Sequence, residues 1–182
     1  MEKKLKTYVL MLSKHFPAGH SRAGEPTGFA EALKANLRRM ECDEECRCVD
    51  FGECVQCLKY HTLRMNADVW EKRASEINAG RAVLSVREWS GRPYEKGGHQ
   101  REVVRLTRLG IQRVTLLYAW SASSKVYLPA FAEVESGQNK KIVEIFKLAS
   151  NDGLSVEDFN NWFASKCPRS HFAILHFTSM RY

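Results

Sequence analysis

Five of the six cysteines lie between Cys42 and Cys57, in a segment that also carries five acidic residues. A segment with so little apolar content cannot form a hydrophobic core of its own. The core of the protein must therefore be built from the residues on both sides of it. At 182 residues the chain is long enough for one domain with a sizeable core. We expect a single domain, 1–182, that carries the Cys-rich segment 41–57 within it.

The cysteine spacing allows a structural zinc site. Cys54 and Cys57 form a C-x-x-C half-site, and Cys42 with Cys46 or Cys48 supplies the other half. The candidate ligands are Cys42, Cys46, Cys54 and Cys57. The alternative is a reduced, acidic loop whose thiols bind nothing, and the spacing favours neither.

The balance of charge favours anionic partners. Lysine and arginine outnumber aspartate and glutamate by 28 to 21, which gives a formal charge of +7 and a pI near 9.2. Such a surface suits RNA, DNA or nucleotides, although a basic surface that is merely solvated is the alternative. The sequence does not specify the oligomeric state.

No apolar run approaches the roughly 20 residues that cross a bilayer, and the residues after Met1 lack a signal-peptide core. We therefore expect a cytoplasmic protein with no membrane partner. In that compartment, thiol or metal chemistry is expected of the cysteines rather than disulfides.

Hydrophobic periodicity predicts five or six strands and three or four helices. Strands are expected at 7–13, 81–89, 126–134 and 171–178, and a β-prone region spans 101–118 with a break near Gly110. Helices are expected after Thr27, over 66–79 with Asn66 as its cap, around 142–149, and after Ser155. Strands and helices do not alternate regularly, so the pattern indicates an α+β fold with a small mixed or closed sheet.

A short stretch after the cysteines concentrates groups with chemical potential. Lys59, Thr62 and Arg64 fall within six residues, directly before the helix predicted at 66–79. In an extended backbone Tyr60, Thr62 and Arg64 share one face, while Lys59 and His61 share the other. A turn-like backbone would instead bring Lys59 and Thr62 together.

Further basic and aromatic residues are candidates for nucleic-acid contacts. Arg92 and Tyr94 lie in a glycine-rich loop, and Arg105 belongs to a series of arginines along the β-prone region. An aromatic ring can stack on a base, and arginines along a strand can face phosphates. Both features are equally compatible with ordinary solvent-facing or core positions.

The order of these elements carries a family resemblance. Lys59-x-x-Thr62-x-Arg64 is followed by a glycine-ended turn and strand at 78–84. The sequence Asn-Asp-Gly-Leu-Ser at 151–155 then precedes an aromatic helix and the strand 174–177. This arrangement resembles the ASCH family, which belongs to the PUA-like superfamily of small β-barrels associated with RNA. The resemblance covers about 8–13 and 59–182, and leaves the Cys-rich segment as an insertion.

The resemblance implies a PUA-like small mixed β-barrel flanked by helices, with a basic cleft that holds RNA or a nucleoside. Some small bacterial members of the family are amidohydrolases that remove the acetyl group of N4-acetylcytidine with a lysine, a threonine and a glutamate. Lys59 and Thr62 match the first two. The nearest match to the glutamate is Asp152, which is one methylene shorter and so departs from the family pattern.

The sequence thus favours an RNA- or nucleotide-binding module with Lys59, Arg64, Arg92, Tyr94 and Arg105 as candidate contacts. The alternative is a metal-independent amidohydrolase that deacylates a modified nucleoside. Its candidate catalytic groups are Lys59 as base, Thr62 as nucleophile and Asp152 as proton shuttle. A third possibility is a protein-interaction module that works through the cysteine insertion. Whether the protein is an enzyme stays open at this point.

Overall fold

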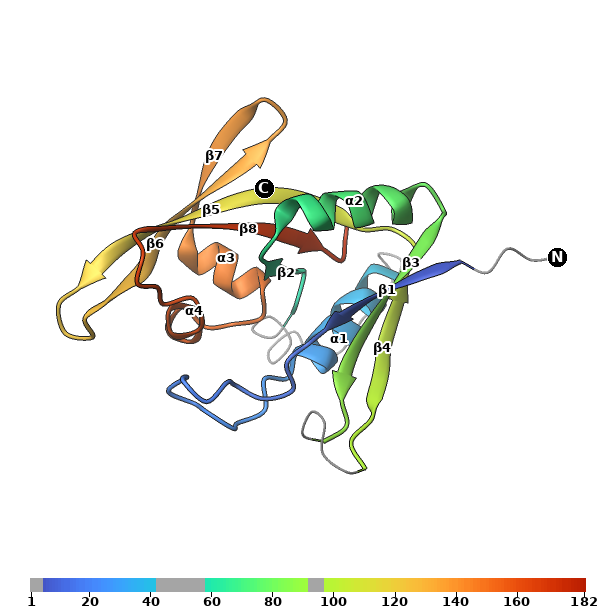
Figure 1. The fold of residues 1–182 in the computed structure, drawn as a ribbon, viewed down its shortest axis with the longest axis horizontal. Helices are drawn as coiled ribbons and strands as arrows, with labels where there is room; N and C mark the ends of the chain where they lie inside the picture. Colours follow the sequence, from blue (N-terminus) through green and yellow to red (C-terminus); the bar gives the residue numbers. More distant parts are fainter. Residues whose placement is uncertain (1–4, 42–57, 92–96) are drawn as a thin grey trace.

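The computed structural model describes residues 5–41, 58–91 and 97–182, which form eight strands and four helices (Figure 1). The strands are β1 Lys6–Met11, β2 His61–Arg64, β3 Ala82–Trp89, β4 Gln100–Leu106, β5 Gly110–Ser121, β6 Val126–Ser136, β7 Asn139–Glu144 and β8 Arg169–His176. The helices are α1 Phe29–Glu41, α2 Ala67–Asn78, α3 Ile145–Asn151 and α4 Val156–Trp162. None of these helices is long and apolar enough to cross a membrane. The predicted mixture of helices and strands is confirmed.

The strands form two sheets. One has the order β1-β3-β4, with β1 and β3 parallel and β3 and β4 antiparallel. The other has the order β2-β8-β5-β6-β7 and is antiparallel throughout. Across the described ranges no strand pairing joins the two sheets, so the closed barrel stays a prediction.

The helices cover the larger sheet on both faces. Side chains alternate along β5, so Val114 and Leu116 are buried on one face while Arg113 points to the other. Helix α2 lies on the face that carries Arg113, and Arg113 Nε donates a hydrogen bond to Glu71 of α2. Helix α3 packs on β6 and β7 and buries Leu148 and Ala149, and Figure 1 shows α2 and α3 on opposite sides of the sheet.

Several local predictions are confirmed. The β-prone region divides into β4 and β5 at Gly110. Ser155 precedes α4 and its hydroxyl accepts a hydrogen bond from the Asp158 backbone N–H at 3.0 Å. Gly80 follows α2 with a φ of 69°, the left-handed conformation that commonly ends a helix.

Two predictions at helix starts are wrong. The helix expected around 142–149 begins only at Ile145, because Ile142 lies in β7 and pairs with Glu133 of β6. The hairpin's backbone bonds prevail there over the helical spacing of apolar residues, and Ile142 is 57% exposed. Asn66 does precede α2, but it adopts a left-handed conformation and its side chain makes no capping hydrogen bond.

Candidate functional site

Tyr60, between Lys59 and His61, connects three parts of the fold through its backbone hydrogen bonds. The Tyr60 backbone N–H donates to the Asn151 carbonyl at the end of α3, with 2.8 Å between nitrogen and oxygen. The Tyr60 carbonyl accepts from the backbone N–H of Phe177, just after β8, at 2.9 Å. These bonds fix the start of β2 against the residues that follow α3. As a result, Lys59 and Asp152 become neighbours although 93 positions separate them.

Lys59 and Asp152 form a buried ion pair. The exposed fractions are 0% for Lys59 and 3% for Asp152. Lys59 Nζ donates to the Asp152 carboxylate and also to the Asp152 backbone carbonyl, at 2.5 Å. The ammonium also lies 3.9 Å from the centre of the Phe29 ring, a cation–π distance. This conformation therefore does not offer Lys59 to a phosphate in solvent.

Burial shifts both partners toward their neutral forms. It lowers the pKa of Lys59, and the charge of Arg64 lowers it further, while the Asp152 carboxylate acts in the opposite direction. Burial also raises the pKa of Asp152, against the stabilising contacts with Lys59, Arg64 and the Leu63 backbone. The two pKa values are thus shifted toward each other, a pattern that is common at functional sites.

Thr62, Arg64 and Asp152 line one small cavity of about 20 Å³. Its walls are Ser13, Phe29, Thr62, Arg64, Asp152, Leu154, Trp162 and Phe163. A space of this size holds about one water molecule. Thr62 and Arg64 share this side of β2, as expected for an extended backbone. In the described part of the chain no hydrogen bond joins Lys59 to Thr62, and Lys59 reaches the cavity wall through its contacts with Asp152 and Phe29.

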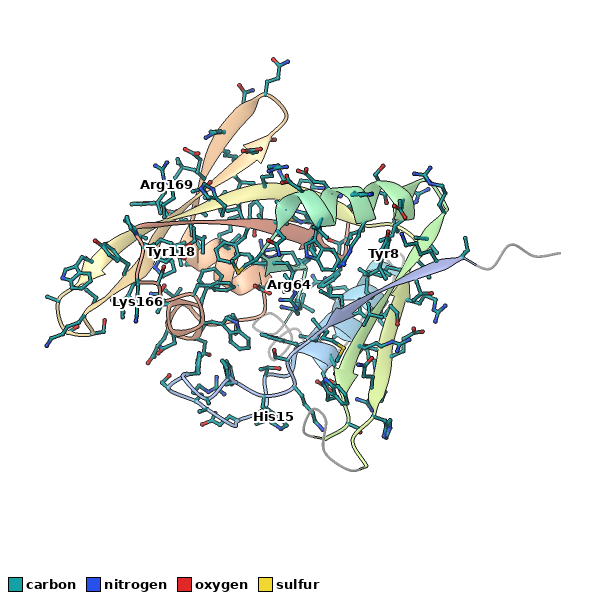
Figure 2. All side chains as sticks on the ribbon, viewed as in Figure 1. Tyr8, His15, Arg64, Tyr118, Lys166 and Arg169 are labelled. Carbon is teal, nitrogen blue, oxygen red and sulfur yellow. The ribbon has the colours of Figure 1, made fainter. Side chains whose placement is uncertain are left out.

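Arg64 bridges the two sheets beside this cavity. Its guanidinium donates to the Leu63 carbonyl at 3.0 Å and to the Met11 carbonyl of β1 at 2.8 Å. Figure 2 shows Arg64 near the centre of the molecule, between the two sheets. Burial lowers the pKa of Arg64, which is opposed by the Asp152 charge. The cavity therefore has a basic and an acidic group on its wall.

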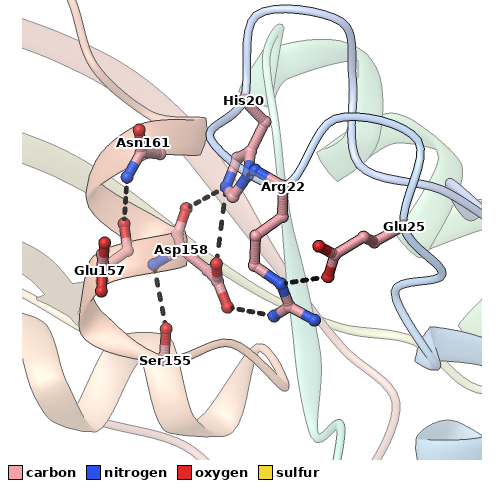
Figure 3. Close-up of polar contacts among 7 residues, drawn as sticks. All are labelled: His20, Arg22, Glu25, Ser155, Glu157, Asp158 and Asn161. Carbon is pink, nitrogen blue, oxygen red and sulfur yellow. Dashed lines mark hydrogen bonds and ion pairs between the residues drawn. The ribbon is translucent and has the colours of Figure 1, made fainter.

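A loop between β1 and α1, whose Ser13 lines the cavity, is held to α4 by polar contacts (Figure 3). Arg22 Nη1 donates to Asp158 Oδ2 at 2.9 Å, and Arg22 Nε donates to Glu25 at 2.7 Å. His20 is 5% exposed, and its Nε2 lies 3.0 Å from the Asp158 backbone carbonyl. Its ring stacks on Phe16 with the centroids 4.4 Å apart. The loop is therefore docked through Asp158.

A wider groove shares part of its wall with the cavity. It has a volume of about 720 Å³, and its walls are Met65, Asn66, Ala67, Asp68, Arg113, Tyr118, Trp162, Phe163, Ala164, Ser165, Ser170, His171 and Phe172. Trp162 and Phe163 line both spaces. Tyr118 lies on the same side of the larger sheet as α4 in Figure 2. The groove is thus an aromatic extension of the Asp152 cavity.

The other predicted site residues do not join this cavity. Arg105 lies on the exposed face of β4, in the smaller sheet, and pairs with Glu102 at 2.9 Å. Arg101 and Arg113 of the same arginine series are likewise engaged by carboxylates. The nucleic-acid candidates Arg92 and Tyr94 lie outside the described residues.

The four candidate zinc ligands, Cys42, Cys46, Cys54 and Cys57, also lie outside the described residues. Among residues 5–41, 58–91 and 97–182, no group of three or more histidine, cysteine, aspartate or glutamate side chains is placed to hold a metal ion. Zinc binding by the Cys-rich segment stays a prediction.

Sequence reasoning missed a hydrogen-bonded group behind the site. The Tyr182 hydroxyl lies 2.8 Å from His61 Nε2 and accepts from Asn151 Nδ2 at 2.8 Å. Because Asn151 precedes Asp152, this group supports the turn that carries the carboxylate. Phe29, Trp162 and the docked loop were missed as well. Their contacts depend on packing between distant segments, for which the sequence holds no local signal.

Comparisons of the chain with protein-family models, with curated proteins and with solved structures gave no match.

Proposed function

We propose that the protein is a PUA-like module of the ASCH type that binds RNA or a nucleotide through one base in the Asp152 cavity. The observation that carries the proposal is the composition of that cavity. Its polar wall is formed by Thr62, Arg64 and Asp152, and aromatic rings of Phe29 and Trp162 face it. Proteins recognise an unstacked base by stacking on aromatic rings and by hydrogen bonds to its edge.

The polar groups suit the edge of a base. A carboxylate accepts from an exocyclic amine, a guanidinium donates to a ring nitrogen or carbonyl, and a hydroxyl does either. The aromatic groove beyond Trp162 and Phe163 then offers room for the sugar and a neighbouring nucleotide. The net charge of +7 favours a ligand that carries phosphate.

Binding requires the cavity to open. At about 20 Å³ it is far smaller than the roughly 300–1,000 Å³ typical of small-molecule sites. We infer that Trp162 makes this room by moving together with the loop between β1 and α1, since Trp162 lines the cavity and packs against Phe16 and His20 of that loop. The bond between Arg22 and Asp158 holds the loop against α4.

Binding of short, labelled single-stranded RNAs measured by fluorescence anisotropy tests the proposal. We expect Arg64→Gln and Trp162→Ala to weaken binding by about tenfold or more, since stacking and charge-assisted bonds each contribute about 1–3 kcal/mol. Lys140→Gln removes the same charge from the distant β6–β7 hairpin and serves as the matched control. Affinity should also fall steeply with salt. Equal affinities for Arg64→Gln, Trp162→Ala and wild type would contradict the proposal.

A specific contact favours a second candidate function, deacylation of a modified nucleoside such as N4-acetylcytidine. Lys59 bonds to Asp152, and Asp152 lines the cavity beside Thr62. The Lys59 ammonium would first pass a proton to Asp152, since burial shifts the pKa of each toward its neutral form. The neutral Lys59 amine, turned from Asp152 toward Thr62, would then take the hydroxyl proton as Thr62 Oγ1 attacks the acyl carbon. The leaving amine then takes a proton from Asp152, and water hydrolyses the acyl-threonine ester.

A screen of N-acylated nucleosides separates the two functions. If the protein is an amidohydrolase, we expect wild type to release the free amine and Thr62→Val to release none. Thr62→Val is the sharper variant because it leaves the Lys59–Asp152 pair in place, and Lys59→Ala then tests the base. Lys166→Ala, an exposed lysine after α4, is the control. Base binding without release of the amine by wild type would leave the binding module as the function.

A further inference from the structure

A second cavity lies where the chain leaves β8. It measures about 390 Å³, within the range of small-molecule sites. Its walls are Asn78, Arg108, Leu109, Gly110, His176, Phe177, Thr178, Ser179 and Arg181. None of these residues lines the Asp152 cavity or the aromatic groove.

Arg181 lies directly on the backbone of Gly110. A Cβ added at Gly110 would be only 1.8 Å from Arg181 Nη2 and 2.2 Å from Cζ. The absence of a side chain at position 110 therefore creates the space that the guanidinium occupies. Arg181 Nη1 donates to the carbonyls of Thr178, at 2.9 Å, and Met180, at 2.6 Å, so the planar group has a defined orientation.

The charge of this cavity is positive and uncompensated. Arg108 and Arg181 are its charged residues, and within the described ranges neither forms an ion pair with a carboxylate. The loop that carries Arg108 is fixed, because the Asn78 side chain bonds to both the N–H and the carbonyl of Leu109 at 2.9 Å. Arg181 also lines an adjacent cavity of about 220 Å³ whose other charged side chains are Lys141, Lys147 and Glu144, so positive side chains outnumber negative ones there as well.

His176 adds a buried polar group that lacks a partner. It pairs with Gly110 across the strands and is 1% exposed. Neither of its ring nitrogens has a hydrogen-bond partner in the part of the chain that the structure describes. Such groups are rare in folded proteins, and a neutral imidazole retains one donor and one acceptor. A ligand oxygen that enters beside Arg181 would supply a partner.

We propose that this cavity binds a phosphate monoester, with the phosphate between Arg108 and Arg181 and the organic group against Leu109 and Phe177. Guanidinium groups bind phosphate oxygens through two parallel, charge-assisted hydrogen bonds. Two such groups complement the double charge of a phosphate monoester better than the single charge of a carboxylate ligand. The remaining volume accommodates the esterified group. The proposal concerns a site separate from the Asp152 cavity, so it stands or falls independently of the nucleotide-binding function.

Titration calorimetry on the full chain with inorganic phosphate, the monophosphate ester phenyl phosphate and acetate tests the proposal, since none of these carries a nucleobase. We expect the monophosphate to bind most tightly and acetate least. Equal affinity for inorganic phosphate and the monophosphate would overturn the ester assignment. Absence of heat from both phosphate compounds at millimolar concentration would overturn the site.

Matched variants locate the binding. Arg108 is exposed, so Arg108→Gln leaves the fold intact, and we expect it to weaken monophosphate binding about tenfold or more. Arg169→Gln, at the opposite end of β8, removes the same charge and should bind like wild type. Gly110→Ala should also weaken binding because the new methyl group displaces Arg181. Equal losses in Arg108→Gln and Arg169→Gln would show that only general surface charge is involved.

Discussion

Lys59 Nζ donates hydrogen bonds to both the side-chain and the main-chain oxygen of Asp152, at a place where neither residue is more than 3% exposed. A buried charge without its partner is costly, whereas the pair replaced as a unit often costs little. The two residues are therefore coupled in stability as well as in protonation.

The first prediction concerns this coupling. Lys59→Met should lower the free energy of unfolding by about 3–5 kcal/mol, because it leaves Asp152 buried without a partner. The double variant with Asp152→Leu should lose less than the sum of the two single changes. Urea denaturation measures both, with Lys166→Met at an exposed position as the control. Strict additivity of the two single changes would refute the coupling.

The second prediction concerns Gly153, the residue after Asp152. Its φ of 77° lies in the left-handed region, and an added Cβ would be 3.5 Å from Lys59 Cβ, an ordinary contact. Gly153→Ala should therefore cost about 1–2 kcal/mol from backbone strain alone. Gly137→Ala, at a φ of 63° with open space around it, should cost the same in thermal unfolding. A much larger loss of stability in Gly153→Ala than in Gly137→Ala would contradict the expectation that backbone strain alone sets the cost.

The third prediction concerns pH. Burial, assisted by the Arg181 charge, lowers the pKa of His176 to about 3, and burial also lowers the pKa of His61. An unfolded histidine binds its proton near pH 6.5, so the unfolded state is favoured as pH falls below that value. Stability should be complete above pH 6.5 and should fall by up to about 1.4 kcal/mol per unit of pH for each such histidine.

The interval from pH 6.5 to about 4.5 isolates this effect from the carboxylates, which titrate lower in unfolded chains. His176→Leu should reduce the slope of the unfolding free energy against pH by about 1.4 kcal/mol per pH unit, the contribution of one proton. His15→Gln, at an exposed position labelled in Figure 2, should leave it unchanged. Equal slopes for wild type and His176→Leu would show that His176 is charged in the folded protein.

The fourth prediction concerns the docked loop. Asp158→Asn removes the carboxylate that binds Arg22, so the backbone amides of the loop should exchange with solvent faster. Global stability should fall by about 1–2 kcal/mol. If a base enters the Asp152 cavity when this loop moves, as proposed, base binding there should strengthen. Hydrogen exchange and anisotropy measure the two effects, and Glu157→Gln on the same turn of α4 is the control. Tighter loop protection would contradict the assigned role of Asp158.

Local sequence signals predicted much of the fold. The β-prone region and its break at Gly110, and the cap at Ser155, depend on neighbouring residues and were confirmed. Ile142 was misassigned because the hairpin pairing with Glu133, a contact between strands, decided its conformation. Asn66 was expected to cap α2 with its side chain. It instead has a left-handed backbone and makes no capping bond, which its position before the helix did not reveal.

The sequence predicted which residues belong to the candidate site better than it predicted how they are arranged. The family resemblance selected Lys59, Thr62 and Asp152, and the structure brings Lys59 into contact with Asp152 and Thr62 into the same cavity wall. The complete burial of Lys59 beneath Phe29 was not foreseen, because it arises from packing of α1 against residues distant in the sequence. Single-sequence patterns do not encode such contacts.

The parallel pairing of β1 with β3 has a consequence for biosynthesis. Lys6 pairs with Ala82, so the partner strand emerges from the ribosome about 76 residues after the first one. At typical rates of about 5–20 residues per second, that delay lasts about 4–15 s. During this time Leu10, which is buried in the finished protein, has no sheet to join. β1 must therefore wait for its partner strand, and pairing over such a separation slows folding.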